Sequence, residues 1–529
     1  MIEEAAIAPN ESPCAQPGGG GPLTYAFDRT EFWRAIPAWR DVDAETFGDF
    51  RWQQRNSVTS IQGIQEALGE LAKPALIADI EAGLLKTPMN VRLTPYIFSR
   101  IHWGNVEDDP VRRQFLPLGS QFVPDHPHVM DDSLAEDSNK ATPHLTHRYP
   151  DKALFLPITL CPVYCSFCTR SRVVGGSTAV KSKSTYGAKS TEWDATFDYI
   201  RSQPELEDIV ISGGDALLLR PNQIRQIGTT LLQIPTVRRI RFATKGLAIM
   251  PMKFTSDTEW VEALGEVCQL GRERMKEVAL HTHFNTDREI TAWTARAMEA
   301  LATTGVRVRN QSVLISGVND GFDCLHYTNK KLSSLLVQPY YVYLHDMVPG
   351  CEHLRTTVDR AEYLSRRLQG SIAGFNTPRV VCDAPGGGGK REISSYTLYD
   401  REIGVSAWTS PTAKPGEIFY YYDPIHRLPE DGQALWANEA EIGRRLAKFK
   451  TEAEERTFWE THDSSDYVDW SQAKPASFPK LKPSTKTISL RLPEALLDRI
   501  KIEANKRDMP YQSLIKAWLK DDVDESRAG

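Results

Sequence analysis

Long apolar runs are absent from this 529-residue chain, and so is a marked excess of charge of either sign. Without a run of about eighteen or more apolar residues, we expect no segment that crosses a bilayer. The N-terminus lacks a basic stretch followed by an apolar one, so we expect no secretory signal and a cytoplasmic protein. The formal net charge is only −6, which argues against a nucleic acid or a membrane as the partner of the whole chain.

Cysteine is also scarce, and its placement indicates a metal site rather than a disulfide framework. The sequence has eight cysteines, and three of them lie within the segment CPVYCSFC. Metal ligation in a reducing compartment fits this clustering better than crosslinking does. The length of the chain favours several domains and a large core.

Composition and periodicity divide the chain into five predicted segments. Residues 1–22 are rich in proline and glycine and are expected to be disordered, whereas residues 23–150 carry apolar side chains at helical spacing. Residues 151–400 alternate short apolar runs with amphipathic stretches, which predicts an α/β core with a parallel sheet, either open or curled into a barrel. Residues 401–484 are an extension and linker, and residues 485–525 are a separate small module. In such parallel sheets the chemistry lies at the carboxyl ends of the strands.

The three clustered cysteines directly follow the predicted strand ALFLPIT. Cys161, Cys165 and Cys168 have C-x-x-x-C-x-x-C spacing within one loop, so their thiolates can bind three irons of a cubane 4Fe–4S cluster. The fourth iron then stays open to a small molecule. Zinc normally takes four ligands, or three and a water, and usually from C-x-x-C pairs. We therefore predict an iron–sulfur site in preference to zinc or to three incidental buried cysteines.

The cysteine loop and the segments on both sides of it resemble the lysine 2,3-aminomutase family of radical S-adenosylmethionine (SAM) enzymes. The likeness extends over about residues 47–400 and is carried, in the family's order, by FRWQQRN, DDPVRRQ, LTHRYPDKAL, CPVYCSFCTRSR, ISGGDALLL, HTHFN, NQSVLISGVND, QPYYVYLHDMVPGCEHLRT and DAPGGGGK. It implies an α/β fold, a partial (βα)6-type radical SAM barrel that follows a helical N-terminal region. It also implies that SAM binds the open iron and is cleaved to a 5′-deoxyadenosyl radical.

A second motif, Gly213, Gly214 and Asp215, follows the predicted strand DIVIS. The glycines permit close approach of the backbone, and Asp215 offers a carboxylate acceptor. A strand followed by GGD is by itself more often a plain turn. The resemblance implies that these three residues bind the methionine amino group of SAM.

The segment DAPGGGGK, residues 383–390, follows the predicted strand RVVCD. Four glycines can offer backbone N–H groups to an anion, and a lysine on such a loop suits Schiff-base formation with an aldehyde cofactor. Its spacing is not that of a P-loop, and alone it would more often be a flexible loop with a solvated lysine. The resemblance implies that Lys390 is catalytic and holds pyridoxal 5′-phosphate (PLP), and that Arg148 and Tyr149 also bind this cofactor.

Three charged residues bear on the choice of substrate. The resemblance implies that Arg170 receives the substrate carboxylate and that Asp346 and Asp383 contact the ε-ammonium group of lysine. Two carboxylates favour a cationic side chain and repel glutamate or aspartate. The implied reaction interconverts L-lysine and β-lysine: the radical abstracts a hydrogen from C3, and the amino group migrates from C2 to C3. Arginine or another basic amino acid remains an alternative substrate.

The resemblance also implies partners, and one feature of the family is missing. We expect a homo-oligomer and an electron donor such as flavodoxin or ferredoxin. Clostridial-type members bind a structural zinc through a cysteine just after the GVND segment and further cysteines near the C-terminus. Here Gly321 follows that segment and no cysteine occurs after Cys382, so we expect no zinc. The segment RFATKGLAIMPMKF diverges from the family, which leaves the adenosine-side contacts open.

The predicted C-terminal module resembles a ribbon-helix-helix fold. Its strand directs Thr487, Ser489 and Arg491 to one side, and two amphipathic helices follow. Such a module dimerises by pairing two strands into a ribbon that enters the DNA major groove, where these three side chains would face the bases. Because that face has one arginine and the chain then becomes acidic (DDVDE), a dimerisation tail without a DNA role is a nearly equal alternative. With DNA binding, the chain would be both an enzyme and an autoregulator.

Overall fold

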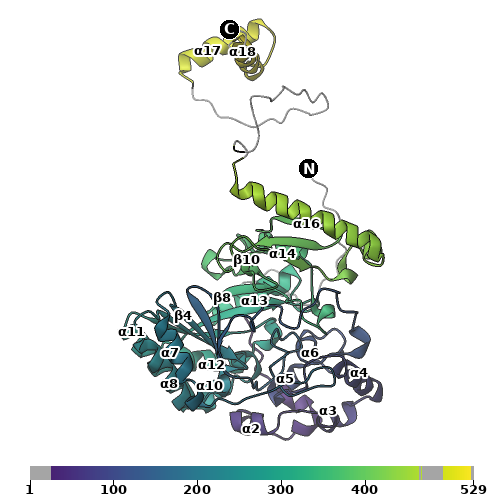
Figure 1. The fold of residues 1–529 in the computed structure, drawn as a ribbon, viewed down its shortest axis with the longest axis vertical. Helices are drawn as coiled ribbons and strands as arrows, with labels where there is room; N and C mark the ends of the chain where they lie inside the picture. The colour runs from purple at the N-terminus through teal and green to yellow at the C-terminus, as the bar shows by residue number, and fades with distance from the viewer. Residues whose placement is uncertain (1–24, 464–465, 467–491, 526–529) are drawn as a thin grey trace. The chain divides into compact units, whose positions relative to one another are not determined.

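The computed structural model of the protein describes residues 25–463, 466 and 492–525. They belong to two compact units, Met1–His462 and Asp463–Gly529, whose elements are labelled in Figure 1. None of the described helices is both long and apolar enough to cross a membrane.

A ten-stranded sheet forms the centre of the first unit, and its strands lie side by side in chain order. Strands β3 to β9 are all parallel, whereas β1, β2 and β10 run antiparallel to their neighbours. The strands are β1 (Lys140–Thr142), β2 (Leu145–Tyr149), β3 (Lys152–Ile158), β4 (Asp208–Gly213), β5 (Arg239–Ala243), β6 (Glu277–Thr282), β7 (Arg307–Leu314), β8 (Val337–Leu344), β9 (Arg379–Ala384) and β10 (Gly389–Glu392). The parallel strands confirm the predicted α/β core.

Six helical connections join the seven parallel strands. Their helices are α7 (Asp194–Ser202), α8 (Pro221–Gln233), α9 (Gly246–Ile249), α10 (Lys253–Ser256), α11 (Thr258–Glu273), α12 (Ala292–Thr303), α13 (Phe322–Ser334) and α14 (Val358–Leu368). The order of the sheet is open, with β1 and β10 at its two edges. Nevertheless Arg148 on β2 forms an ion pair with Asp383 on β9, so the sheet is curled, as expected of a partial (βα)6-type barrel.

Strand β4 and helix α8 show how the sequence builds this core. In β4 the side chains of Ile209 and Ile211 are fully buried and alternate with less buried positions, which is the period of a strand. Helix α8 begins at Pro221, whose missing N–H costs nothing in the first turn. Its Ile224 and Ile227 are fully buried on one face, which is the period of a helix.

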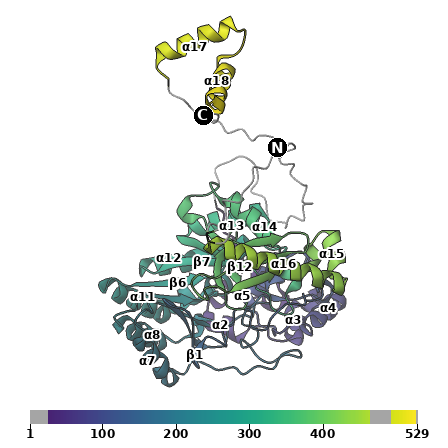
Figure 2. The ribbon, with the colours of Figure 1, turned by 45° about the horizontal axis from the view of Figure 1, so that its top comes forward.

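The N-terminal region consists of short helices. They are α1 (Ala44–Phe47), α2 (Phe50–Arg55), α3 (Ile61–Leu68), α4 (Pro74–Leu84), α5 (Pro95–Arg100) and α6 (Pro110–Phe115). Trp33 stacks on Phe47 with ring centroids 4.1 Å apart, in a core that is continuous with that of the barrel. Helices α3 and α4 lie on the side of the unit away from α7 and α8 (Figure 2). Strands β1 and β2 follow these helices within the predicted helical region, and they are too short and polar to show a strand pattern in the sequence.

A second, antiparallel sheet follows the barrel and supports one of its loops. It contains β11 (Leu398–Asp400), β12 (Val405–Thr409) and β13 (Ile418–Tyr422), and helices α15 (Glu430–Trp436) and α16 (Glu439–Thr461) follow. The hydroxyl of Tyr421 on β13 donates a hydrogen bond of 2.9 Å to the carbonyl of His345. The aromatic stretch EIFYYYDPIH thus contributes a strand that supports the residue before Asp346.

The described part of the second unit is a pair of helices. Helix α17 (Glu494–Lys506) packs against α18 (Tyr511–Glu525), and Ile500, Ala504 and Leu514 are buried. Two consecutive helices are expected of a ribbon-helix-helix module. The predicted strand with Thr487, Ser489 and Arg491 lies outside the described residues.

Candidate active site

The three clustered cysteines lie in the loop that leaves β3 at the carboxyl edge of the sheet. Each is half-buried, and Cys161 and Cys168 pack against a small apolar cluster that includes Tyr164. Burial raises the pKa of each thiol, to about 12 for Cys165, where the ammonium group of Lys245 opposes the rise. A thiol in this state becomes a thiolate when a metal binds to it.

Three cysteine thiols are a donor set that suits an iron–sulfur cluster. Among residues 25–463, 466 and 492–525, no three His, Cys, Asp or Glu side chains are grouped so that they could hold one metal ion. A cubane does not require such a group, because each cysteine binds a different iron. Burial and Asp215 are the largest causes that raise the pKa of Cys161. Cys168 and Cys165 raise it further, so the three thiols are close enough to interact. This arrangement is compatible with the 4Fe–4S cluster that the resemblance implies.

Gly213 and Gly214 lie against the backbone that leads into the cysteine loop. Gly213 has a φ of 103°, and a Cβ added to it would lie 2.2 Å from the carbonyl oxygen of Ile158. A Cβ on Gly214 would lie 2.1 Å from the carbonyl oxygen of Leu160, the residue before Cys161. Only glycine fits at these two positions. The predicted SAM motif and the cysteine loop are therefore packed backbone to backbone.

Asp215 is buried, and backbone donors already bind its carboxylate. It accepts hydrogen bonds from the N–H of Leu217 at 2.8 Å and from the N–H of Lys245 at 2.9 Å. Burial raises the pKa of Asp215. These bonds join the loop after β4 to the loop after β5 and fix the orientation of the carboxylate. Its predicted contact with the methionine amino group stays a prediction.

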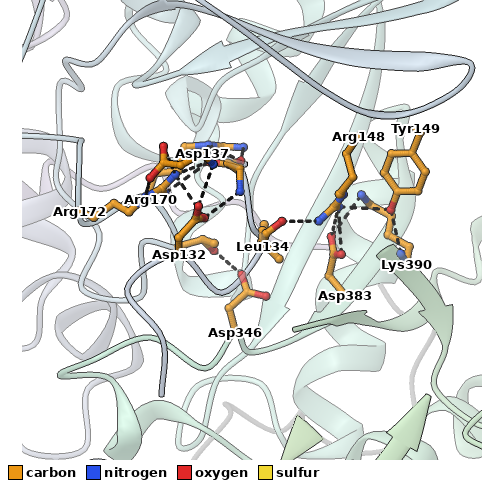
Figure 3. A network of polar contacts seen from close by, with 12 residues as sticks. Asp132, Leu134, Asp137, Arg148, Tyr149, Arg170, Arg172, Asp346, Asp383 and Lys390 are labelled. Atoms are coloured by element: carbon orange, nitrogen blue, oxygen red, sulfur yellow. Dashed lines mark hydrogen bonds and ion pairs between the residues drawn. The ribbon is translucent and has the colours of Figure 1, made fainter. Parts of the chain in front are cut away.

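A group of charged residues joins strands from the two ends of the sheet (Figure 3). Lys390 on β10 stands opposite Asp383 on β9, and its Nζ lies 3.4 Å from the Asp383 carboxylate. Arg148, on β2, donates from Nη2 to the same carboxylate at 3.0 and 3.2 Å. The hydroxyl oxygen of Tyr149 accepts a hydrogen bond of 2.9 Å from the N–H of Lys390. Four of the predicted site residues therefore meet in one network.

The charges in this network compensate one another. Partial burial lowers the pKa of Lys390, but Tyr343 and Asp383 outweigh it and raise that pKa above its usual range. Burial alone would raise the pKa of Asp383, but Lys390 and Arg148 hold it below its ordinary value. The turn before Lys390 has positive φ at three of its four glycines, which brings β10 back along β9. A lysine amino group beside an arginine guanidinium fits PLP, with its aldehyde and its phosphate.

Asp346 follows β8. In Figure 3 it lies between two groups of charged residues, one around Asp383 and the other around Arg170. It is half-buried and accepts a hydrogen bond from the hydroxyl of Thr169. Burial and then the Asp383 carboxylate raise the pKa of Asp346 to about 7. In contrast to Asp383, it has no ion-pair partner among the residues that the structure describes. It is therefore a place where an added cation would be stabilised.

Glu136 is a site residue that the sequence did not indicate. Its buried carboxylate accepts hydrogen bonds from Nε of Arg170 at 3.0 and 3.1 Å and from Nη2 at 2.7 Å. Burial alone would raise the pKa of Glu136, but Arg170 and Arg172 hold that pKa below its usual value. Arg170, the predicted carboxylate receptor, is thus already paired on one side. Glu136 belongs to an irregular segment before β1, where an acidic run (DDSLAED) is the only signal in the sequence.

The ion pair of Lys245 and Glu289 lies next to the cysteine loop, and the sequence did not indicate it either. The Nζ of Lys245 is 2.7 Å from Oε1 of Glu289 and 2.8 Å from the carbonyl oxygen of His283. Both charged side chains are almost fully buried. The Nζ also lies 5.9 Å from the ring centre of Phe167, which belongs to the cysteine loop. Lys245 is part of the divergent segment RFATKGLAIMPMKF, so the resemblance did not point to it.

Most of the chain matches curated 2,3-aminomutases. The L-lysine 2,3-aminomutase of Clostridium subterminale is 34% identical over 402 residues, which are 75% of this chain and 89% of that protein. The L-lysine 2,3-aminomutase of Bacillus subtilis is 34% identical over 409 residues, 76% of this chain and 80% of that protein. The glutamate 2,3-aminomutase of Clostridioides difficile is 30% identical over 359 residues, 68% of this chain and 79% of that protein.

The C-terminal part has a different relative. The family described as CopG antitoxin of type II toxin–antitoxin system matches residues 444–522.

Among solved structures, Streptococcus suis SuiB bound to S-adenosylmethionine aligns with 44% of this chain and 51% of its own chain, at a TM-score of 0.32 and 12% identity. The relatives that are more than 30% identical over more than two thirds of this chain decide its family. The chain is an isomerase of the lysine 2,3-aminomutase family of radical SAM enzymes, whose cofactors include a 4Fe–4S cluster and SAM, and it has a CopG antitoxin-like segment at its C-terminal end.

Proposed function

We propose that this chain is a PLP-dependent 2,3-aminomutase that interconverts L-lysine and β-lysine. In this proposal three thiolates hold the 4Fe–4S cluster, the motif after β4 binds SAM, and one lysine holds PLP beside an arginine and a tyrosine. These cofactor-binding residues are Cys161, Cys165, Cys168, Gly213, Gly214, Asp215, Lys390, Arg148 and Tyr149.

The observation that carries the choice of substrate is the unequal state of two neighbouring carboxylates. Arg148 and Lys390 both bind Asp383, whereas Asp346 is half-buried with a pKa raised to about 7 and a hydroxyl group as its hydrogen-bond donor. A cation that approached Asp346 would recover the free energy that burial takes from its carboxylate. The ε-ammonium group of lysine is a cation of this kind at the end of a flexible chain.

When bound, the cluster with SAM supplies the radical that takes a hydrogen from C3, and PLP supplies a ring that delocalises the unpaired electron. The chain's own residues hold the two ends of the amino acid. Arg170 receives the carboxylate through its bidentate guanidinium group, and Asp346 and Asp383 hold the ε-ammonium. Fixing both ends of a flexible substrate places C3 at one position, and such orientation is a large part of the rate gained by an enzyme.

Membership of the family does not by itself settle the substrate, because the family includes a glutamate 2,3-aminomutase. The charge at Asp346 and Asp383 argues against an acidic substrate for this chain. A glutamate side chain would bring a carboxylate close to Asp346, which has no ion-pair partner among the described residues, and like charges that are desolvated together repel by several kcal/mol. A basic side chain removes the repulsion that already exists between the two aspartates. Arginine satisfies the same argument and is the alternative substrate.

The test is turnover by the reconstituted holoenzyme, with Asp346→Asn as an isosteric variant that removes one negative charge. We expect L-lysine to give β-lysine, detected by chromatography, and the variant to lose about a hundredfold or more in kcat/KM because a desolvated charge pair is lost. Conversion of L-arginine without conversion of L-lysine would establish the alternative substrate. Conversion of glutamate would show that the argument from charge is wrong.

The proposal includes partners of the enzyme. Reduction of the cluster requires a one-electron donor, which we propose to be of the flavodoxin or ferredoxin class, and we propose that the enzyme is cytoplasmic. We also infer a homo-oligomer. Co-purification and sedimentation of the reconstituted protein test these two points.

A second candidate function belongs to the C-terminal end, and the match to the CopG antitoxin family favours it. In this proposal the module pairs with that of a second chain, and Thr487, Ser489 and Arg491 face DNA bases. The chain would then bind its own promoter as an autoregulator. Salt-dependent retention of the intact protein on that DNA, abolished by Arg491→Ala, is the expected result. If the intact protein and its Arg491→Ala variant are retained equally, Arg491 does not face DNA, and the module is a dimerisation element.

A further inference from the structure

Glu136 is held rigidly although it lies in an irregular segment. Its N–H donates a hydrogen bond of 3.0 Å to Oδ1 of Asp132, and the N–H of Asp137 donates one of 2.8 Å to Oδ2 of the same aspartate. The Glu136 side chain is only 7% exposed. A carboxylate fixed at both its backbone and its side chain can in turn fix the group that it binds.

The hydrogen bonds to Glu136 use only one edge of the Arg170 guanidinium. They come from Nε and Nη2. A guanidinium has five N–H groups, so the edge formed by Nη1 and the second N–H of Nη2 remains for another bidentate acceptor. The Arg170 side chain is 21% exposed, and the residue before it, Thr169, donates to Asp346. The remaining edge can therefore take a carboxylate in the region of the proposed substrate site.

The balance of charge supports this division of the guanidinium. Arg172 also approaches Glu136, at 3.5 Å, but it has two further carboxylate partners in Asp132 at 3.2 Å and Asp137 at 3.3 Å. Arg172 is thus compensated without Glu136. Arg170 has Glu136 as its one ion-pair partner among the described residues, and it must keep an orientation while the carboxylate of the substrate enters and leaves.

We infer that Glu136 is a positioning residue that orients Arg170 for the substrate carboxylate. This inference rests on the proposed function, since it takes Arg170 to be the carboxylate receptor. Glu136 binds the inner edge of the guanidinium and leaves the outer edge to the amino acid. It contributes to binding of the substrate and has no part in the bond-breaking steps.

The test is a double-mutant cycle of Glu136→Gln and Arg170→Met in the holoenzyme. The dissociation constant of L-lysine is read from the change in PLP absorbance, and KM and kcat are measured where turnover permits. We expect Glu136→Gln to weaken binding about tenfold to a hundredfold, as loss of a charge-assisted hydrogen bond does, with a much smaller effect on kcat. In the Arg170→Met background it should weaken binding no further, because the residue that it positions is gone.

The neighbouring Asp137→Asn is the matched control, because Asp137 is exposed and forms its ion pair with Arg172. It should leave the affinity for lysine unchanged. Should Glu136→Gln not fold, Glu136→Asp keeps the charge on a shorter side chain and should raise KM with kcat retained. Cluster content and thermal unfolding of every variant show whether the fold is intact.

Each outcome decides a separate question. Effects of Glu136→Gln and Arg170→Met that add would show that Glu136 acts independently of Arg170, which overturns the inference. A Glu136→Asp variant with the KM of the wild type would overturn it as well. Failure of the proposed function looks different: lysine would not bind to the wild-type enzyme at all. If another α-amino acid binds instead, the same cycle is measured with it, since its carboxylate is the same group; if none binds, both proposals are wrong.

Discussion

Replacing Gly214 by alanine tests whether the SAM motif and the cysteine loop depend on one another. The added Cβ would lie 2.1 Å from the carbonyl oxygen of Leu160 and 2.6 Å from its N and C atoms. All three are backbone atoms, so no side-chain rotation relieves the overlap. Heavy atoms essentially never approach a Cβ within 3.0 Å, so one backbone must move by about 0.9 Å. Cys161 is the next residue along the chain and must move with it.

The consequences divide into a small effect on stability and a large one on activity. Overpacking of this size destabilises a protein by about 1–3 kcal/mol, which a chain of this length can tolerate. A displacement of about 1 Å at a reacting centre costs on the order of a hundredfold in rate. We therefore expect Gly214→Ala to fold, to bind less iron and sulfide, and to cleave SAM about a hundredfold more slowly.

Iron and sulfide content, the visible absorbance of the cluster and the rate of 5′-deoxyadenosine formation measure these effects. Gly374→Ala is the control, because a Cβ there meets no atom within 4 Å. It should behave as the wild type. A Gly214→Ala protein with full cluster content and the wild-type rate of SAM cleavage would refute the reasoning, since the two loops would then tolerate separation.

Three further predictions concern charged residues of the candidate site. Lys390→Ala should abolish the PLP absorbance and leave the colour of the cluster intact; loss of both would mean that Lys390 is needed for the fold. The affinity for lysine should rise with pH through about 7, because burial and Asp383 raise the pKa of Asp346 to that value and the carboxylate form attracts the ammonium; Asp346→Asn should remove this step, and a step that survives belongs to another group. Lys245→Met leaves the carboxylate of Glu289 buried without its cation and should lower the free energy of unfolding by about 3 kcal/mol or more in denaturant titrations. The exposed Lys189→Met should change it by less than about 1 kcal/mol, and equal effects of the two substitutions would contradict this account.

The barrel could be predicted from the sequence because its elements carry their own periodicity. Strand β4 alternates buried and less buried residues, and helix α8 buries every third or fourth residue, so each is visible within its own segment. Strands β1 and β2 have three and five residues and are largely polar. Strand β2 forms because β3 offers it an edge to pair with, and β1 forms on the edge of β2 in turn, which is information from outside their own sequence.

The candidate site divides in the same way. The three cysteines could be singled out because their spacing already suggests a cluster, whereas the glycines before Lys390 gained a meaning only from the resemblance to the family. The partners of the charged residues could not be singled out. Arg148 and Asp383 are 235 residues apart in the chain, and Arg170 and Glu136 are 34 apart. Such pairs form only where the fold brings two segments together, and no pattern in either segment records the other.

The turn that carries Cys168 joins the source of the radical to the residues that would hold the substrate. Within it, Cys168 is a predicted cluster ligand, Thr169 donates to Asp346, and Arg170 binds Glu136. The turn is closed by a hydrogen bond of 3.0 Å from the N–H of Ser171 to the carbonyl of Cys168. Three consecutive residues thus face three different partners, and consecutive Cα atoms are only about 3.8 Å apart. The three residues are adjacent, so Cys168 cannot shift relative to both Asp346 and Glu136 without breaking one of these contacts. Reactions that pass a radical between bound groups depend on such fixed separation, because a misplaced substrate leaves the radical to react elsewhere.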